Sequence, residues 1–349
     1  MLLLKRPRES TEDRRVFKAP KYSHSLTLVS LPTEILDIIF SHLTKQDILN
    51  LSTLDYDFRK NLIPVVLLEV LFTWKQIIQR SDDFFEKYKY LIQQVRISDS
   101  NSLHEWNYDV FTELLIRLPN LKRLLIHSQS SSNWLKYRQH DNLEQLTLYC
   151  VNHNVGLFSP MNNKFFSLDH VANFKMLKRL ELHNYRFYRD HARSYPVLII
   201  EDIALINCSW DFPFEISQLN YNENIRRLTL RNSGNDSFIV SERYRYFLES
   251  EVLKSLEELE ISITEGKLSS SLNCTMVSRF MKVENFPSLL KLRFRGWNTT
   301  YNISHWFNKL PENNTLQVLE LKLDSEVDDK ERSQRECKKY FPYLKLELD

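Results

Sequence analysis

Glycine is scarce in this chain. Only 4 of the 349 residues are glycine, namely Gly156, Gly234, Gly266 and Gly296, and no two of them are close in sequence. A phosphate-binding loop or a dinucleotide fold needs clustered glycines, because side chains there would keep the backbone away from the phosphates. The glycine-flanked serine motif of hydrolases is absent as well. We therefore expect a protein that is not an enzyme and needs no cofactor.

Cysteine is equally sparse and shows no metal-binding pattern. The four cysteines, Cys150, Cys208, Cys274 and Cys337, lie far apart, and none forms a CxxC pair or a cluster with histidine. This spacing predicts no structural metal site and is typical of reduced thiols in an intracellular protein. The apolar run at residues 1–4 is too short for a signal peptide, and no stretch is long enough to span a membrane. We expect a protein of the nucleus, the cytoplasm or both, with no membrane partner.

An excess of charge of either sign is also missing. The chain has 47 basic and 45 acidic side chains, whereas a general nucleic-acid binder has a clear basic excess. Nucleic acid is therefore not the expected partner. Hydrophobic residues make up 42% of the chain, which is enough to form a large core.

Residues 1–25 contain little apolar surface and are predicted to be a disordered basic tail. Two short basic clusters give this tail two possible roles, nuclear import or simple solubilisation, and the sequence does not separate them. The clusters consist of Lys5, Arg6, Arg8, Arg14 and Arg15.

Three short amphipathic helices are predicted next. Pro32 suits the first helical position, and Glu34 lies in the first turn, where the helix dipole favours an acid. Thr44 and Asp47 have the spacing of a capping box and start the second helix. Pro64 is expected to end the third helix.

This pattern resembles the F-box, a module that docks on the Skp-type adaptor of cullin ubiquitin ligases. The match covers Leu31-Pro32, Glu34, Ile35-Leu36, Ile39, Leu43, the step Asp47-Ile48-Leu49, and Leu51. The alternative is an ordinary helical cap whose apolar residues pack inward. The resemblance implies a docking surface that is formed by Leu31, Pro32, Ile35, Leu36, Ile39 and Leu43.

Helical spacing of apolar residues continues over residues 65–91 and predicts one more helix. The resulting domain organisation is a tail at 1–25, an F-box at 26–72, a linker helix at 73–91 and a second domain at 92–349.

The second domain is built on a repeated six-residue pattern, apolar-x-x-apolar-x-apolar. Each copy has the two-residue alternation of a short strand. Nine copies begin between Ile92 and Leu316 at intervals of about 28 residues, and a shortened copy closes the chain. The copies are Ile92/Val95/Ile97, Leu121/Leu124/Ile126, Leu143/Leu146/Leu148, Leu177/Leu180/Leu182, Ile200/Ile203/Leu205, Ile225/Leu228/Leu230, Leu256/Leu259/Ile261, Leu289/Leu292/Phe294, Leu316/Leu319/Leu321 and Leu344/Leu346/Leu348.

Helical patterns follow three of these copies, at residues 106–118, 244–252 and 303–310. A strand, a loop and a helix in each unit resemble the leucine-rich repeat, which implies an α/β solenoid with parallel strands on a concave face and helices outside. That family prefers Asn or Cys just after the last leucine. Cys208 fits this preference, whereas Tyr185 and Trp297 do not.

The residues that flank the second and third apolar positions should point out of the strand face. Many of them are cationic or aromatic, and acids such as Glu181 and Asp202 interrupt the row. One hypothesis is that the face binds an acidic or phosphorylated protein substrate, because arginines bind such groups bidentately. The alternative is that the charges pair with one another. The candidate substrate-binding residues are Arg123, His127, Tyr149, Arg179, His183, Arg227, Arg231, Arg293 and Arg295.

Together the two resemblances imply the substrate-recognition subunit of a Skp–cullin–F-box ubiquitin ligase. The expected partners are the Skp-type adaptor, the cullin and RING subunits reached through it, and a protein substrate. The alternative is a scaffold that uses the same adaptor contact without ubiquitination. Sequence does not separate these two functions, because both use the same motif.

Overall fold

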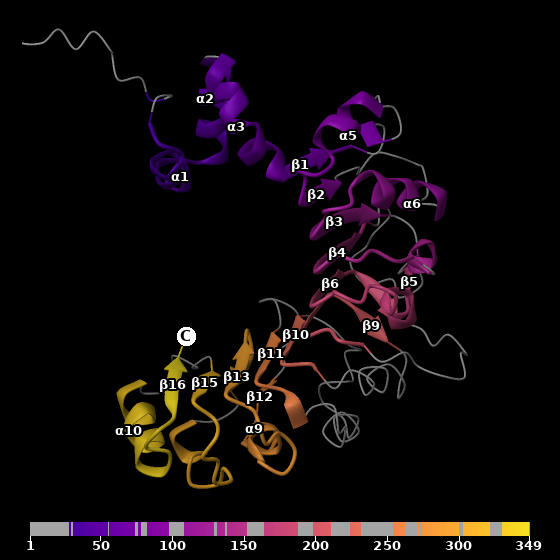
Figure 1. Ribbon diagram of the computed structural model, residues 1–349. Helices are drawn as coiled ribbons and strands as arrows, with labels where there is room; N and C mark the ends of the chain where they lie inside the picture. Colours follow the sequence, from indigo (N-terminus) through magenta and orange to yellow (C-terminus); the bar gives the residue numbers. More distant parts are fainter. Residues whose placement is uncertain are drawn as a thin grey trace, which may run out of the picture. The chain divides into compact units, whose positions relative to one another are not determined.

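A computed structural model describes the chain in segments that separate into two compact units, Met1–Val66 and Leu67–Asp349 (Figure 1). No helix among the described residues is long and apolar enough to cross a membrane. The described residues are 28, 31–54, 56–73, 76–77, 82–97, 108–128, 131–136, 138–151, 164–187, 198–210, 224–231, 254–262, 271–272, 274–299, 303–321 and 330–348.

The first unit contains three short helices, α1 (Thr33–Ser41), α2 (Lys45–Leu54) and the start of α3 (Tyr56–Leu68). Their common core is formed by Leu36, Phe40, Ile48 and Leu62. The predicted capping box is confirmed, because the Asp47 N–H donates to the Thr44 hydroxyl at 3.2 Å and the Thr44 N–H donates to the Asp47 carboxylate at 3.2 Å.

Two predicted boundaries in this unit are wrong. Pro32 is the N-cap of α1 rather than its first helical residue, and its carbonyl accepts the N–H groups of Ile35 and Leu36. Pro64 does not end α3, which continues to Leu68. A proline inside a helix removes one backbone hydrogen bond, and here Val65 and Val66 beyond it pack against the core.

The continuous helix predicted over residues 65–91 does not form. Residues Glu69–Phe72 are strand β1, and α5 begins only at Asp82 and ends at Tyr88. Leu67, Val70 and Phe72 repeat the six-residue apolar pattern, so they pack on the second unit's core, where Phe72 is fully buried. The apolar residues here have helical spacing, but packing against the second unit's core favours a strand instead.

The second unit is organised by one sheet of 11 parallel strands in the order β1-β2-β3-β4-β6-β8-β10-β11-β13-β15-β16. This is the α/β class that the sequence predicts, and the sheet is consistent with a repeat solenoid. The strands after β1 are β2 (Gln94–Ile97), β3 (Arg123–Ser128), β4 (Gln145–Cys150), β6 (Arg179–His183), β8 (Asp202–Ile206), β10 (Arg227–Arg231), β11 (Glu258–Ser262), β13 (Lys291–Arg295), β15 (Val318–Leu321) and β16 (Lys345–Leu348).

The strand register places equivalent residues of successive copies side by side. Leu124 pairs with Leu146, which pairs in turn with Leu180. All three apolar positions of all ten copies are buried. Each copy therefore covers the apolar side chains of the copy before it, and the core is one continuous row from Phe72 to Leu348.

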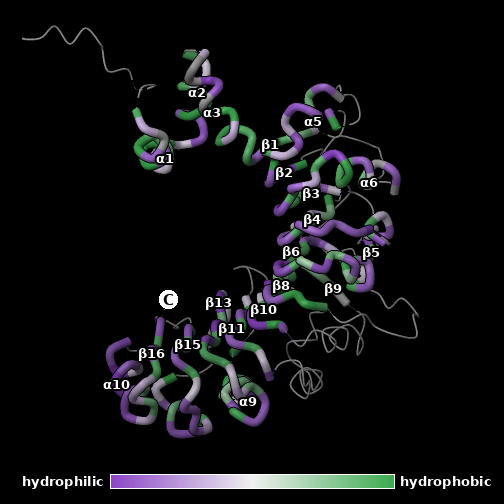
Figure 2. The backbone as a smooth tube through the Cα atoms, viewed as in Figure 1, coloured by the Kyte–Doolittle hydropathy of each residue, from purple (hydrophilic) through white to green (hydrophobic). Residues whose placement is uncertain are grey.

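The described helices and turns between these strands lie on one side of the sheet (Figure 1). They are helices α6 (Tyr108–Arg117), α9 (Cys274–Met281) and α10 (Lys330–Tyr340) and the 3-10 turns η2 (Ser132–Leu135), η3 (Leu168–Val171) and η5 (Ile303–His305), and short outer strands accompany them. The outer strands are β5 (Lys164–Phe166), β7 (Tyr185–Phe187), β9 (Ser209–Trp210), β12 (Ser271–Leu272) and β14 (Asn298–Thr299). Figure 2 shows α10 as a hydrophilic helix, whereas α1 of the first unit is mostly hydrophobic.

The helix predicted at 303–310 is wrong in type. Only the turn η5 forms, followed by hydrogen bonds from the Trp306 N–H to Ile303 at 2.9 Å and from the Lys309 N–H to Trp306 at 2.7 Å. Trp306 and Phe307 are nevertheless buried. A tight turn places these large side chains under the sheet as well as a helix would.

The chain turns sharply where several strands end. Asn184, Asn207 and Gly296 follow β6, β8 and β13 directly and have φ values of 63°, 52° and 74°. Glycine and asparagine tolerate this left-handed conformation best. The Asn184 amide also donates to the Cys150 carbonyl at 3.0 Å, which joins two neighbouring copies.

The residue after this turn is buried and faces the preceding strand. The Cys208 thiol donates to the Leu182 carbonyl at 3.3 Å, and the Trp297 indole donates to the Ile261 carbonyl at 3.1 Å. Tryptophan thus supplies the donor for which the leucine-rich pattern uses Asn or Cys. Any buried donor that reaches the carbonyl meets the same requirement.

Some predictions fall on residues outside the described ranges. They are the basic tail with its import candidates, the helix at 244–252 and Trp106 of the first predicted helix.

Replacement of Asn184 tests the turn. The Asn184→Gly variant loses only the side-chain hydrogen bond and should be about 1 kcal/mol less stable than the parent chain. The Asn184→Ala variant loses the same hydrogen bond and keeps a Cβ in the left-handed region without the local side-chain hydrogen bonding that lets asparagine tolerate it, so it should be about 1 kcal/mol less stable than the glycine variant. The midpoint of urea unfolding measures both changes. Equal stability of the two variants would contradict the strained turn.

Candidate functional site

The face of the sheet opposite the helices, which we call the open face, carries the side chains between the buried apolar positions. Register aligns them in three rows across the strands, and one row passes through Gln94, Arg123, Gln145 and Arg179. Register therefore decides which charged side chains are neighbours. The ion pairs divide the open face into a middle, a C-terminal and an N-terminal part.

The middle of the open face is an ion-pair cluster around Asp202. The Asp202 carboxylate lies 3.7 Å from an Arg179 nitrogen and 3.2 Å from Nε of Arg227. Glu181 lies 3.3 Å from Arg179 and 2.8 Å from Nε2 of His183. The hydrogen bond to His183, followed by the charges of His183 and Arg179, lowers the pKa of the Glu181 carboxyl against the effect of its burial.

The C-terminal part of the open face is a second cluster, in which Glu258, Glu260 and Glu320 hold the cations. Arg293 lies 3.3 Å from Glu258 and 3.1 Å from Glu320, whose side chain is only 5% exposed. The remaining ion pairs are Lys291–Glu258 at 3.0 Å, Arg295–Glu320 at 3.2 Å, Arg295–Glu260 at 3.7 Å and Arg231–Glu260 at 3.4 Å.

These distances separate the nine candidate substrate-binding residues into two groups. The candidates from β6 onward each have a carboxylate partner on the open face, as the pairing alternative expects. They are Arg179, His183, Arg227, Arg231, Arg293 and Arg295. Arg123, His127 and Tyr149 lie on β3 and β4, outside both clusters.

Three aromatic rings stack across the edge of the middle cluster. The His127 and Tyr149 rings are 4.6 Å apart and 9° from parallel, and the Tyr149 and His183 rings are 3.8 Å apart and 21° from parallel. Burial first, then the charges of Arg96 and His183, lowers the pKa of His127. Within the described structure, Nε2 of His127 is buried without a hydrogen-bond partner.

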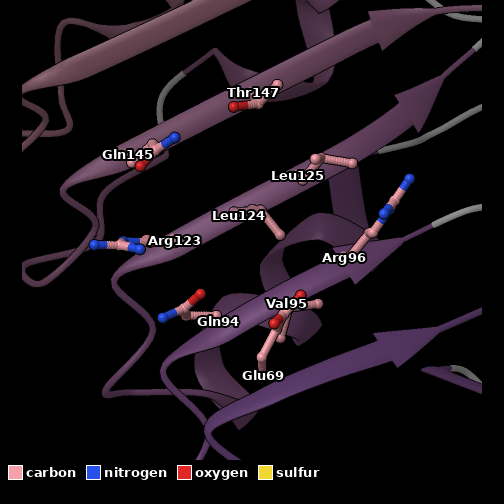
Figure 3. A pocket seen from close by; sticks show the side chains of 9 residues that line it. All are labelled: Glu69, Gln94, Val95, Arg96, Arg123, Leu124, Leu125, Gln145 and Thr147. Atoms are coloured by element: carbon pink, nitrogen blue, oxygen red, sulfur yellow. The ribbon is translucent and has the colours of Figure 1, made fainter. Parts of the chain in front are cut away.

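A pocket of about 210 Å³ lies beside the ring stack on strands β1 to β4. Figure 3 shows Arg96 and Arg123 extending in opposite directions from it. Both arginines are exposed, and no carboxylate among the described residues lies within ion-pair distance of either. The pocket is lined by Glu69, Gln94, Val95, Arg96, Arg123, Leu124, Leu125, Gln145 and Thr147.

Arg96 lies between Val95 and Ile97, so the repeat pattern places it on the open face, but it is not among the nine candidates that the sequence suggested. The available signal was the absence of acids. The register partners of Arg96 and Arg123 on β2, β3 and β4 are Leu125, Gln94 and Gln145, whereas Asp202 stands between Arg179 and Arg227. A search for cations without an acidic register partner selects Arg96 and Arg123, but it also selects Arg231, whose partners are Ile206 and Ser262 and which pairs diagonally with Glu260.

The first unit carries the other candidate surface, on helix α1. Ile35 is 44% exposed and Ile38 58% exposed, and they share one side of the helix because they are three residues apart. Pro32 is exposed, and Leu31, Ile39 and Leu43 are half-buried against the core. Leu36 is only 5% exposed, so it holds α1 in place and does not face solvent.

Comparison with known proteins adds little to this geometry. No model of a protein family matches the chain, and no curated protein sequence matches it. Among solved structures, a crystal structure of a protein from Bacteroides fragilis is similar at 14% identity and a TM-score of 0.36, covering 90% of this chain and 71% of the other. Similarity at this level carries no argument about function.

The electrostatic link between Arg96 and His127 can be measured directly. The guanidinium disfavours the protonated imidazole, so the Arg96→Gln variant should raise the pKa of His127. Burial remains in the variant and still keeps the pKa below its ordinary value. NMR titration of the imidazole protons measures the shift, with Arg279→Gln, an exposed arginine of α9, as the control. An unchanged pKa in Arg96→Gln would contradict the link.

Proposed function

We propose that this chain is a substrate-recognition subunit of a Skp–cullin–F-box ubiquitin ligase. In this proposal the first unit is an F-box that binds the Skp-type adaptor. The second unit is a divergent leucine-rich-repeat domain that binds a protein substrate. The chain supplies no chemistry of its own, and it acts by holding a substrate lysine near the ubiquitin-conjugating enzyme, which raises the effective concentration.

The exposed apolar side of α1 is the observation that carries the proposal. The two isoleucines are three residues apart on one side of the helix, so they form a small apolar patch that suits a partner with an apolar surface of its own. They lie in the segment that resembles the docking motif, next to Leu31 and Pro32. The small core around Leu36 and Leu62 leaves these side chains outside, where an adaptor can reach them.

The eleven-stranded sheet supports the second half of the proposal. Its open face presents a long row of polar side chains that the helices do not cover. A rigid parallel sheet holds such side chains at fixed spacing, which suits recognition of an extended protein segment.

Substitution of the exposed isoleucines tests adaptor binding without disturbing the core. The Ile35→Ser/Ile38→Ser variant should bind a Skp-type adaptor at least about thirtyfold more weakly, because central apolar contacts are worth about 2 kcal/mol. Isothermal titration with purified proteins measures the affinity. The matched control is Ile116→Ser, since Ile116 is also an exposed helical isoleucine, 68% exposed on α6.

The Leu31→Ala/Pro32→Ala variant tests the same surface from its other end and should also lose adaptor affinity. Unchanged affinity in both double variants, with circular dichroism like that of the parent, would show that the first unit is not an F-box. Affinity purification then separates ligase from scaffold. Recovery of cullin with a partner that accumulates on proteasome inhibition supports the ligase, and adaptor without cullin supports the scaffold.

A further inference from the structure

Some cations of the open face form ion pairs with carboxylates of the same face, and others do not. From β6 to β15, each arginine of the two clusters lies within ion-pair distance of Asp202, Glu258, Glu260 or Glu320. An anionic ligand at these arginines would have to displace a carboxylate and leave it without a cation. The carboxylate would then lack a cationic partner, and this cost would cancel much of the binding free energy gained from the ligand.

The pocket on β1 to β4 imposes no such cost. Arg96 and Arg123 have no carboxylate within ion-pair distance among the described residues, so an incoming anion meets them directly. Gln94 and Gln145 flank Arg123 in one row, and Thr147 lies beyond Leu125 in the row of Arg96; their amide and hydroxyl groups line the same pocket and can form hydrogen bonds (Figure 3). Glu69 lines the same pocket, and the two arginines outnumber it.

Register fixes the spacing of the two arginines. Gln94 pairs with Arg123, so Arg96 lies one strand away and two residues further along. From strand geometry their Cα atoms are roughly 8 Å apart, and Figure 3 shows the guanidinium groups diverging. Because the guanidinium groups diverge, their charges are further apart than the Cα atoms. In an extended peptide, side chains two or four residues apart are about 7 or 14 Å apart and point to the same side.

We propose that this pocket binds an acidic peptide segment with two anionic side chains, one held by Arg123 and the other by Arg96. The inference rests on the proposed function, because the peptide would belong to the recognised substrate, and it names the substrate class and the residues that select it. The anionic groups are carboxylates or phosphates, which share the bidentate geometry that arginine binds.

The pKa of His127 can report binding at Arg96. The charge of Arg96 contributes to the low pKa of His127. An anion bound to Arg96 offsets that charge, so the pKa of His127 should rise when the peptide binds. By linkage, affinity for the peptide should increase modestly as the pH falls through this pKa.

Peptide binding to the purified full chain tests the proposal. The probe is a fluorescein-labelled octapeptide of alternating glutamate and serine, and its affinity is measured by fluorescence polarisation at low and physiological salt. A second probe carries phosphoserine in place of glutamate, and a third carries glutamine as the neutral control. Tighter binding of the phosphoserine probe would identify phosphate as the preferred anion, and equal binding would show that carboxylates suffice.

Three double variants remove two positive charges each from different places. Arg96→Gln/Arg123→Gln should weaken binding of the glutamate probe at least tenfold and abolish the His127 shift. Arg179→Gln/Arg227→Gln, which removes cations that Asp202 already holds, should weaken it less than threefold. Arg279→Gln/Arg335→Gln, on α9 and α10, controls for net charge. In the opposite direction, Glu69→Gln should strengthen binding.

Three results would overturn the inference. They are equal losses in the first two double variants, unchanged affinity in Arg96→Gln/Arg123→Gln, and no difference between the glutamate and glutamine probes with the parent chain. Failure here is distinguishable from failure of the proposed function. Adaptor binding is measured without peptide and should be unchanged in the arginine variants. Peptide binding is measured without adaptor and should be unchanged in Ile35→Ser/Ile38→Ser.

Discussion

Parallel pairing in strict register is the constraint on which the rest of this structure depends. A single six-residue copy has three apolar side chains and cannot bury them alone. Stacked copies bury them against one another, and the same register aligns the polar side chains on the open face. The core and the open face are therefore set by one geometric rule. A slip of one residue would turn the apolar side chains outward and the arginines inward.

Much of the second unit could be predicted, because a short strand pattern that recurs along the chain is compatible with few folds. The alternation in Leu180 and Leu182 decides which side chains are buried, and recurrence decides that the strands stack. The same rule should have identified β1, since Leu67, Val70 and Phe72 carry the pattern. They were assigned to a helix because their neighbours have helical spacing as well. Local periodicity cannot choose between two structures when it fits both.

The side-chain chemistry was less accessible from sequence. Asp202 could be read as an interruption of a basic stripe, yet it is the group that neutralises Arg179 and Arg227. An acid can separate two arginines or form ion pairs with them. The outcome depends on which strand lies next to the acid and on the rotamers of the long side chains, and the sequence of one strand predicts neither. The place of Trp297 after β13 was equally hard to predict. The backbone requires a donor at that place, and the residue type that supplies it is free to vary.

The ion pairs from β6 onward have a consequence for how such a surface can change. Five arginines there are held in position by acids on neighbouring strands, with Glu260 between Arg231 and Arg295. Loss of one acid would uncover guanidinium groups that are already in position, without any new basic residue. A single substitution that neutralises an acid would thus change the charge of this face by exposing arginines that the fold already holds in place.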